Sequence, residues 1–174
     1  MFVGRQEPRK GLQVLLRAWP EIHRRSGARL RIVGADPLAV RLLLTRERIP
    51  DAGIDVLGFL SQEDLTAELL AAKALAAPSL GGESFGMVLT RAFACATPVV
   101  ASDIPGYREV MTPGAAVGFP AGDARALTNA VVALLEDEPR RQALGEGARR
   151  VAVERYSWDE IGRRLVAIYE REAA

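Results

Sequence analysis

Residues 78–103 read PSLGGESFGMVLTRAFACATPVVASD. The stretch begins where an apolar run ends, passes through a glycine turn that contains Glu83, continues as an amphipathic helix and ends in a second apolar strand. A glycine turn that opens onto a helix N-terminus is typical of an anion site, because free backbone N–H groups and the positive end of the helix macrodipole face the ligand. Glu83 lies within this turn, so the segment is not a plain phosphate loop.

The helix that follows Glu83 has apolar residues at the spacing i, i+3, i+4, i+7, i+8 and i+11, which predicts a face packed into the core. These residues are Phe85, Val88, Leu89, Ala92, Phe93 and Ala96. Ser84, Met87 and Arg91 fall on the opposite side. Seven helical residues rise about 10 Å, so a ligand with its diphosphate at the helix start would bring its ribose near Arg91.

Apolar runs and helical patterns alternate on both sides of this stretch. Alternation of this kind predicts βαβ units and a mostly parallel sheet. We therefore expect an α/β fold: a Rossmann-like parallel sheet of about six strands with helices on both faces and a C-terminal helical tail. The predicted strands are residues 1–4, 29–33, 54–57, 75–77, 99–101 and 116–118, and helices are predicted at 38–48, 64–72, 123–136, 139–154 and 158–170.

Local signals mark several helix ends. Leu12, Leu15, Leu16 and Trp19 form one apolar stripe, and Pro20 predicts that this first helix kinks or ends early. The predicted N-caps are Ser61 and Asp123. Tyr156 and Ser157 separate the last two helices.

Composition narrows the function classes. The 174 residues are enough for one domain with a core, and a net charge of +1 gives no general attraction to nucleic acid. Cys95 is the only cysteine, which fits a reducing compartment, and no membrane-spanning run or signal peptide is visible. We expect the chain to be cytoplasmic. Residues 2–4 already read as a strand, so we expect either a domain cut from a longer protein or a protein that lost its front half.

A second charged segment, GRQEPRKG at residues 4–11, follows the first strand and opens a helix. Arg5 and Lys10 therefore flank the carboxyl end of a strand, where open α/β sheets bind ligands. Two cations beside a helix N-terminus suit a diphosphate leaving group, whose charge grows as the bond breaks. A charged, solvated turn is the alternative interpretation of this segment.

The pieces FVGR (2–5), PRKG (8–11), IVG (32–34) and LG (57–58) occur in the chain in this order. GESFG (82–86), PVVASD (98–103), GYREV (106–110) and RYSW (155–158) follow them. Together they resemble the C-terminal half of a GT-B glycosyltransferase of family 4, the group 1 transferases, and in particular actinobacterial phosphatidylinositol mannosyltransferases. The whole chain would then be the donor-binding domain, with the N-terminal acceptor domain absent.

This resemblance implies a nucleotide-sugar donor such as GDP-mannose or a UDP-sugar, transfer of a hexose with retention, and no required cofactor or metal. Arg5 and Lys10 would hold the diphosphate, Glu83 would hold hydroxyls of the transferred sugar, and the turn at 57–60 would hold the base. The final helix would cross to the partner domain through Trp158, Ile161, Leu165 and Ile168. The catalytic residues would be Glu83, Arg5 and Lys10, and the other donor-binding residues Gly58, Leu60, Ser84, Phe85, Gly86, Met87, Val88 and Arg91.

Two positions depart from the family pattern. The family usually has a second carboxylate eight residues after the first, to bind the ribose diol, whereas this chain has Arg91, which can only donate hydrogen bonds. The family also usually has glycine where this chain has Ala96. We expect the alanine only to reduce the space where the helix passes close to a strand.

Two alternatives stay open beside the transferase. Arg91 suggests a degenerate, non-catalytic nucleotide-binding module, and a GT-B sugar-nucleotide epimerase would share the architecture. The acceptor, a lipid or a glycan, is not encoded here, and any peripheral association with the inner face of a membrane would come from the absent half. We expect the isolated chain to bind a nucleoside diphosphate or the donor weakly and to catalyse no sugar transfer.

Overall fold

The computed structural model describes residues 1–172, in which strands and helices alternate as predicted. The strands are β1 (Phe2–Val3), β2 (Leu30–Val33), β3 (Ile54–Gly58), β4 (Leu75–Ala77), β5 (Val99–Ser102) and β6 (Ala116–Phe119). The helices of the first half are η1 (Pro8–Lys10), α1 (Leu12–Ser26), α2 (Pro37–Glu47) and α3 (Gln62–Ala71). Those of the second half are α4 (Met87–Ala94), α5 (Pro105–Arg108), α6 (Ala124–Glu136), α7 (Glu138–Tyr156) and α8 (Trp158–Glu172).

The strands form two three-stranded parallel sheets, β1-β2-β3 and β4-β5-β6, where the sequence predicted one sheet. The two sheets meet at β1 and β4, because the Ala76 N–H donates to the Met1 carbonyl at 2.9 Å. Across both sheets the spatial order is therefore 3-2-1-4-5-6, the order of a doubly wound nucleotide-binding fold. The order runs outward from β1 to β3 on one side and from β4 to β6 on the other, so the winding reverses between β1 and β4.

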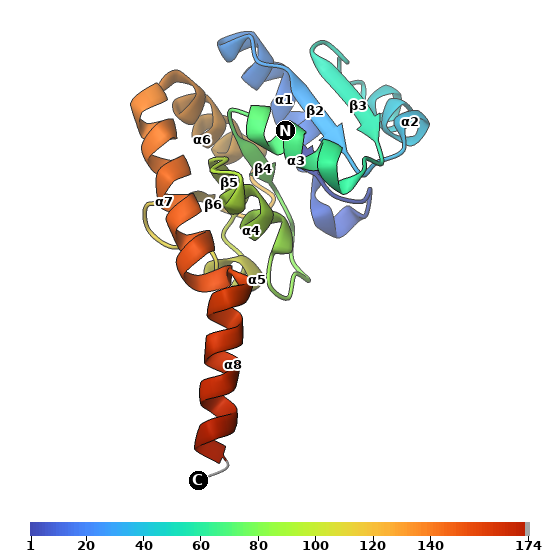
Figure 1. Cartoon of the computed structure of the whole chain (residues 1–174). Helices are drawn as coiled ribbons and strands as arrows, with labels where there is room; N and C mark the ends of the chain where they lie inside the picture. The colour runs from blue at the N-terminus through green and yellow to red at the C-terminus, as the bar shows by residue number, and fades with distance from the viewer. Residues whose placement is uncertain (173–174) are drawn as a thin grey trace.

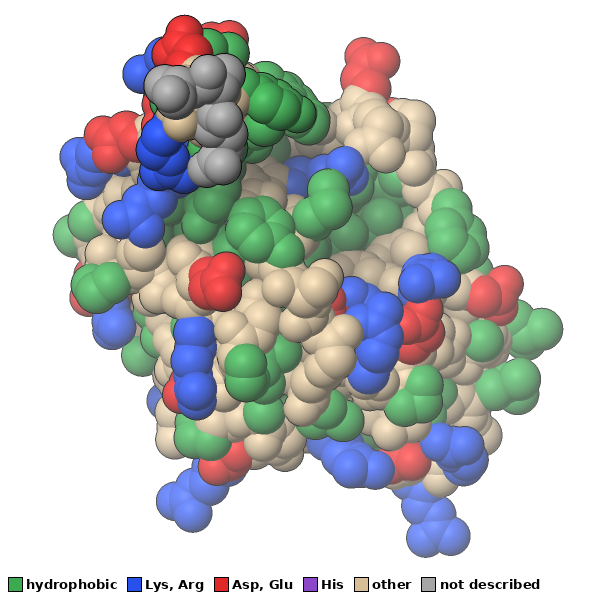
Figure 2. All heavy atoms as spheres, turned by 90° about the horizontal axis from the view of Figure 1, so that it is seen from below, with side chains coloured by type: hydrophobic (Ala, Val, Ile, Leu, Met, Phe, Trp, Pro, Cys, Tyr) green, Lys and Arg blue, Asp and Glu red, His purple; other side chains and the backbone are tan. Residues whose placement is uncertain are grey.

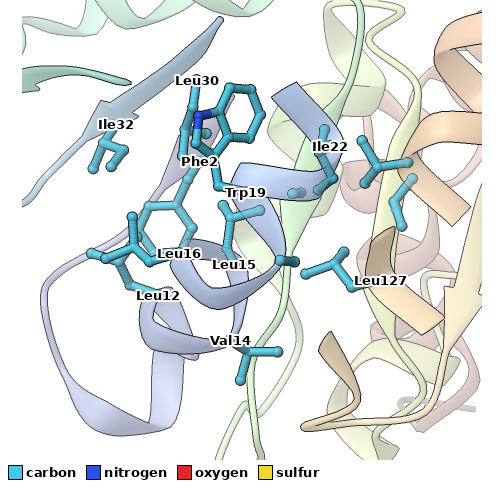
Figure 3. Close-up of a cluster of buried hydrophobic side chains, with 14 of the residues drawn as sticks. Phe2, Leu12, Val14, Leu15, Leu16, Trp19, Ile22, Leu30, Ile32 and Leu127 are labelled. Carbon is cyan, nitrogen blue, oxygen red and sulfur yellow. The ribbon is translucent and has the colours of Figure 1, made fainter. Parts of the chain in front are cut away.

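Neighbouring residues of each strand point to opposite faces, and each face has its own core. Ile32 belongs to a cluster with α1, α2 and α6, in which Trp19 and Ile22 lie against the sheet (Figure 3). The next residue, Val33, belongs to a second cluster, with α3, α4 and α7. Both faces of the sheets are therefore covered by helices, as predicted.

Most helix boundaries follow the predicted signals. The Ser61 and Asp123 side chains cap α3 and α6 by accepting from the N–H groups of Asp64 and Ala126. Pro20 does not end α1, which continues to Ser26, so the prediction of an early end is wrong. The apolar stripe before the proline and the buried Ile22 after it are packed in the same core, and this packing outweighs the backbone hydrogen bond that proline removes.

Ala96 does not lie on the buried face of α4. It is exposed, follows the end of the helix and has a left-handed backbone with φ of 55°. Its N–H donates to Phe93 O and the Thr97 N–H donates to Ala92 O, the pattern of a Schellman C-cap in which glycine is usual. The close approach at this turn is made instead by Gly145 of α7, where a Cβ would lie 2.4 Å from Ala96 O.

Helix α8 projects from the body of the molecule (Figure 1). Its apolar side chains are largely exposed: Trp158 is 85% exposed, and Ile161, Leu165 and Ile168 are exposed along the same helix. The strong segregation of apolar from charged residues along this helix is typical of a helix that packs against something. Within residues 1–172, no helix is long and apolar enough to cross a membrane.

We expect Ala96→Gly to stabilise the protein by about 0.5–1 kcal/mol, because glycine adopts the left-handed conformation without the steric cost that Cβ imposes. Ala94→Gly, two residues earlier in the last turn of α4, should destabilise by about the same amount, because it places glycine within a helix. Urea unfolding of the two variants measures both effects. Two changes of the same sign would contradict this account of Ala96.

Candidate functional site

The loops that follow β1 and β4 meet where the two sheets join. The Leu80 N–H donates to Arg9 O at 2.7 Å, and a Cβ on Gly11 would lie 1.8 Å from Pro78 O. Gly11 also has a φ of 68°, so both its conformation and its contact with the backbone require glycine. The turn that opens α1 is therefore pressed directly against the start of the glycine loop.

Glu83 is held at this junction by one of its two carboxylate oxygens. Its Oε1 accepts hydrogen bonds from Lys10 Nζ at 2.7 Å, Arg9 Nη1 at 3.1 Å and Ser79 Oγ at 3.1 Å. The Glu83 side chain is only 9% exposed and that of Lys10 is 20% exposed. The family resemblance implies that Glu83 holds the sugar and Lys10 the diphosphate. The structure brings these two residues together in a partly buried ion pair.

Arg5 does not join this pair. It lies on the outside, with a side chain 71% exposed, and forms an ion pair with Glu7 at 2.8 Å. Glu7 also binds Arg9 at 2.7 Å, so a chain of charges runs from Arg5 through Glu7 and Arg9 to Glu83. Figure 2, which views the end toward which β2 and β3 run, shows charged side chains of both signs close together among apolar ones.

Arg9 is a cation that the sequence interpretation missed. It lies beside Lys10 in the same turn and also donates to Gly82 O at 3.2 Å, on the glycine loop. The signal was present, because Arg9 and Lys10 are adjacent basic residues in η1. In so short a turn, however, adjacency does not say which of the two side chains faces the opposite loop.

Ser79 and Tyr107 were also missed. The Tyr107 hydroxyl lies 2.8 Å from Ser79 Oγ, and both side chains are buried. Burial raises the pKa of Tyr107 from 10.0 to about 12, so its hydroxyl keeps its hydrogen well above neutral pH. Nothing in the local sequence points to this contact, because the two residues are 28 positions apart.

The start of α4 carries the remaining predicted residues of the loop. Gly86, with a φ of 80°, is the N-cap and offers no side chain, so no side chain caps the N–H groups of the first turn. Ser84 and Met87 are exposed beside it, whereas Val88 and Phe85 are half-buried. The Phe85 ring packs edge-on against Tyr156, with ring centroids 5.4 Å apart.

The three remaining predicted residues, Gly58, Leu60 and Arg91, lie further out. Gly58 ends β3 with a φ of 68°, Phe59 beyond it is 77% exposed, and Leu60 is half-buried against the second core cluster. Arg91 lines a groove between α4 and α7 together with Met87 and Thr90. Its side chain forms no hydrogen bond or ion pair with any of the residues that the structure describes.

These groups form a site with both charge signs. Lys10 and Arg9 can donate to phosphate oxygens, and the uncapped start of α4 adds backbone donors. The carboxylate of Glu83 can accept hydroxyl hydrogens. Among residues 1–172, no group of three or more His, Cys, Asp or Glu side chains is arranged to hold a metal ion.

Known proteins resemble this chain over nearly its whole length. It is 40% identical over 184 aligned residues to a phosphatidyl-myo-inositol mannosyltransferase of Mycobacterium leprae, and the alignment covers 99% of this chain but 46% of that protein. It is 33% identical to a GDP-mannose-dependent monoacylated phosphatidylinositol monomannoside mannosyltransferase of Corynebacterium glutamicum, covering 97% of this chain and 46% of that protein. The chain thus spans about half the length of these relatives.

Solved structures agree on the fold. HepE of Anabaena in complex with UDP superposes with a TM-score of 0.84 at 22% identity, over 98% of this chain and 48% of HepE. Sucrose-phosphate synthase of Thermosynechococcus elongatus superposes with a TM-score of 0.82 at 27% identity, over 98% of this chain and 45% of the synthase. The fold matches that of GT-B glycosyltransferases.

The family described as "Glycosyl transferases group 1" matches residues 1–137, which contain both loops of the site and all six strands. With this match, and with mannosyltransferase relatives aligned over nearly all of the chain, the protein belongs to the group 1 glycosyl transferases.

Proposed function

We propose that this chain is the donor-binding domain of a glycosyltransferase that transfers a hexose from a nucleotide sugar. The observation that carries the proposal is the Lys10–Glu83 pair at the junction of the two sheets, beside the uncapped start of α4. A diphosphate needs cations and backbone donors, and a sugar needs a hydroxyl acceptor. Here both lie within one hydrogen bond of each other.

The proposed donor is GDP-mannose. One relative is named as GDP-mannose-dependent, and several others are named mannosyltransferases. HepE, by contrast, was solved with UDP and with UDP-glucose, so UDP-sugars are the competing class. We further propose that the sugar is transferred with retention, with Lys10 and Arg5 neutralising the departing nucleoside diphosphate.

In this proposal the acceptor is read by a further domain. The chain spans about half of its mannosyltransferase relatives, and α8 exposes an apolar stripe. We propose that Trp158, Ile161, Leu165 and Ile168 pack against that N-terminal domain. The isolated chain then binds donor but lacks the acceptor half of the reaction centre.

Degenerate nucleotide binding is the second candidate function. It is favoured by one observation: the side chain of Arg91, at the position of the expected ribose carboxylate, has no hydrogen bond or ion pair within residues 1–172. An arginine can donate to ribose oxygens but cannot accept the hydrogens of a diol. The two candidates differ in what a restored carboxylate would do.

Lys10→Ala should weaken binding of GDP or UDP roughly 10- to 100-fold, because it removes a charge-assisted hydrogen bond to phosphate. Isothermal titration of the chain with GDP, UDP and ADP measures the effect. Lys73→Ala is the matched control, because Lys73 is the other lysine of the chain and is exposed. Equal affinities in the two variants, or no heat from the unmodified chain at millimolar ligand, would contradict the proposal.

Glu83→Gln should leave the affinity for the free nucleoside diphosphate within about threefold of the unmodified chain, since Lys10 stays in place. The same change should reduce the additional affinity that the sugar contributes, because an amide accepts from hydroxyls less strongly than a carboxylate. Titrations of GDP against GDP-mannose, and of UDP against UDP-glucose, give the two affinities. A selective loss of diphosphate binding would assign Glu83 a different role.

Arg91→Glu should change nucleoside diphosphate affinity by less than about twofold if the chain is a working donor domain. The reason is that Arg91 lines the groove between α4 and α7, which contains neither Lys10 nor Glu83. Arg91→Gln separates the loss of positive charge from the gain of a carboxylate. A tenfold or greater gain in affinity with Arg91→Glu alone would favour the degenerate module, in which the missing carboxylate is what limits binding.

A further inference from the structure

Tyr107 is a buried residue that is not among the proposed contacts with the donor. Its side chain is 1% exposed, and it lies on α5, outside both loops that carry the proposed contacts. Three features nonetheless join α5 to the segment from Ser79 to Gly86. They concern the hydroxyl of Tyr107, its ring, and the glycine that precedes it.

The hydroxyl makes a directed connection to Glu83. Ser79 has one hydroxyl hydrogen, which it donates to Glu83 Oε1 at 3.1 Å. The contact of 2.8 Å between Ser79 Oγ and the Tyr107 hydroxyl must then have Tyr107 as the donor. The raised pKa of Tyr107 is consistent with a hydroxyl that keeps its hydrogen.

The ring of Tyr107 and the backbone of Gly106 both pack against the segment from Glu83 to Gly86. A Cβ on Gly86 would lie 2.7 Å from Tyr107 Cδ1, so the loop passes directly over the ring. A Cβ on Gly106 would lie 1.7 Å from Glu83 O, so the backbone of α5 touches the backbone of Glu83. The loop from Glu83 to Gly86 is therefore shaped around Tyr107.

The consequence concerns the two oxygens of Glu83. Lys10, Arg9 and Ser79 all donate to Oε1, whereas no residue within 1–172 donates to Oε2. A carboxylate whose one oxygen is saturated on three sides has little freedom to rotate, and it presents the other oxygen as an acceptor.

We propose that Tyr107 is a positioning residue: acting through Ser79, it fixes the Glu83 carboxylate so that Oε2 receives a hydroxyl of the transferred sugar. This inference rests on the proposed function as a donor-binding domain. It predicts that Tyr107 affects recognition of the sugar and leaves recognition of the diphosphate unchanged. The reason is that, within residues 1–172, the hydrogen-bond partner of the Tyr107 hydroxyl is Ser79, and neither Lys10 nor the backbone at the start of α4 bonds to it directly.

The test compares Tyr107→Phe, Ser79→Ala and the double variant with the unmodified chain. Titrations with UDP and UDP-glucose, and with GDP and GDP-mannose, give the gain in affinity that the sugar contributes. We expect Tyr107→Phe to reduce this gain about 3- to 10-fold, the value of one hydrogen bond, with the affinity for UDP or GDP unchanged. Tyr169→Phe, which removes an exposed hydroxyl from α8, should change neither affinity.

The double variant distinguishes a relay from two separate effects. If Tyr107 acts through Ser79, the double variant should lose no more than Ser79→Ala alone. Additive losses, or equal losses for the diphosphate and the sugar nucleotide, would overturn the relay and leave Tyr107 as a packing residue.

A crystal structure of Tyr107→Phe tests the inference without any ligand. We expect the Glu83 carboxylate to leave its position or to occupy more than one, and an unmoved carboxylate would overturn the proposal. If the unmodified chain binds no nucleotide while the carboxylate does move in the variant, the structural control of Glu83 by Tyr107 stands, and the proposed function falls together with the sugar contact at Oε2.

Discussion

The structure depends on the contact between the backbone of Gly11 and the carbonyl of Pro78. This contact joins the turn after β1 to the loop after β4, and no side chain larger than hydrogen fits between them. Because parallel strands end at the same edge of a sheet, the two loops meet at the point where the strand order reverses. Lys10 and Glu83, the neighbours of this contact, are consequently brought within one hydrogen bond of each other.

The close approach has an electrostatic consequence. Three donors on one carboxylate oxygen compensate for the desolvation of Glu83, which is largely buried. Removing one partner of a buried ion pair leaves a charge without compensation, which is costly. The arrangement therefore fixes the direction of the carboxylate as well as its place, and the proposed acceptance of a sugar hydroxyl hydrogen requires a fixed direction.

The last two helices differ in how they are packed. Helix α7 closes the second core cluster and ends at Tyr156, whose ring contacts Phe85 of the glycine loop. Helix α8 then leaves the body with its apolar side chains exposed. The relatives of this chain are about twice as long, and an exposed apolar helix face is what the proposed packing against a further domain requires.

The sequence by itself determined the strand positions, the longer helices and the two loops that make the candidate site, because period, caps and glycine turns are local properties. It also identified Lys10 and Glu83, whose side chains follow the ends of strands. It could not determine the split of the strands into two hydrogen-bonded sheets, the continuation of α1 past Pro20, or the left-handed turn at Ala96. Only the tertiary structure decided that Arg9 and not Arg5 reaches Glu83, and that Tyr107 lies beneath the glycine loop. These contacts join residues 28 to 74 positions apart. Which side chain fills such a contact depends on how two loops pack, and no local pattern records that packing.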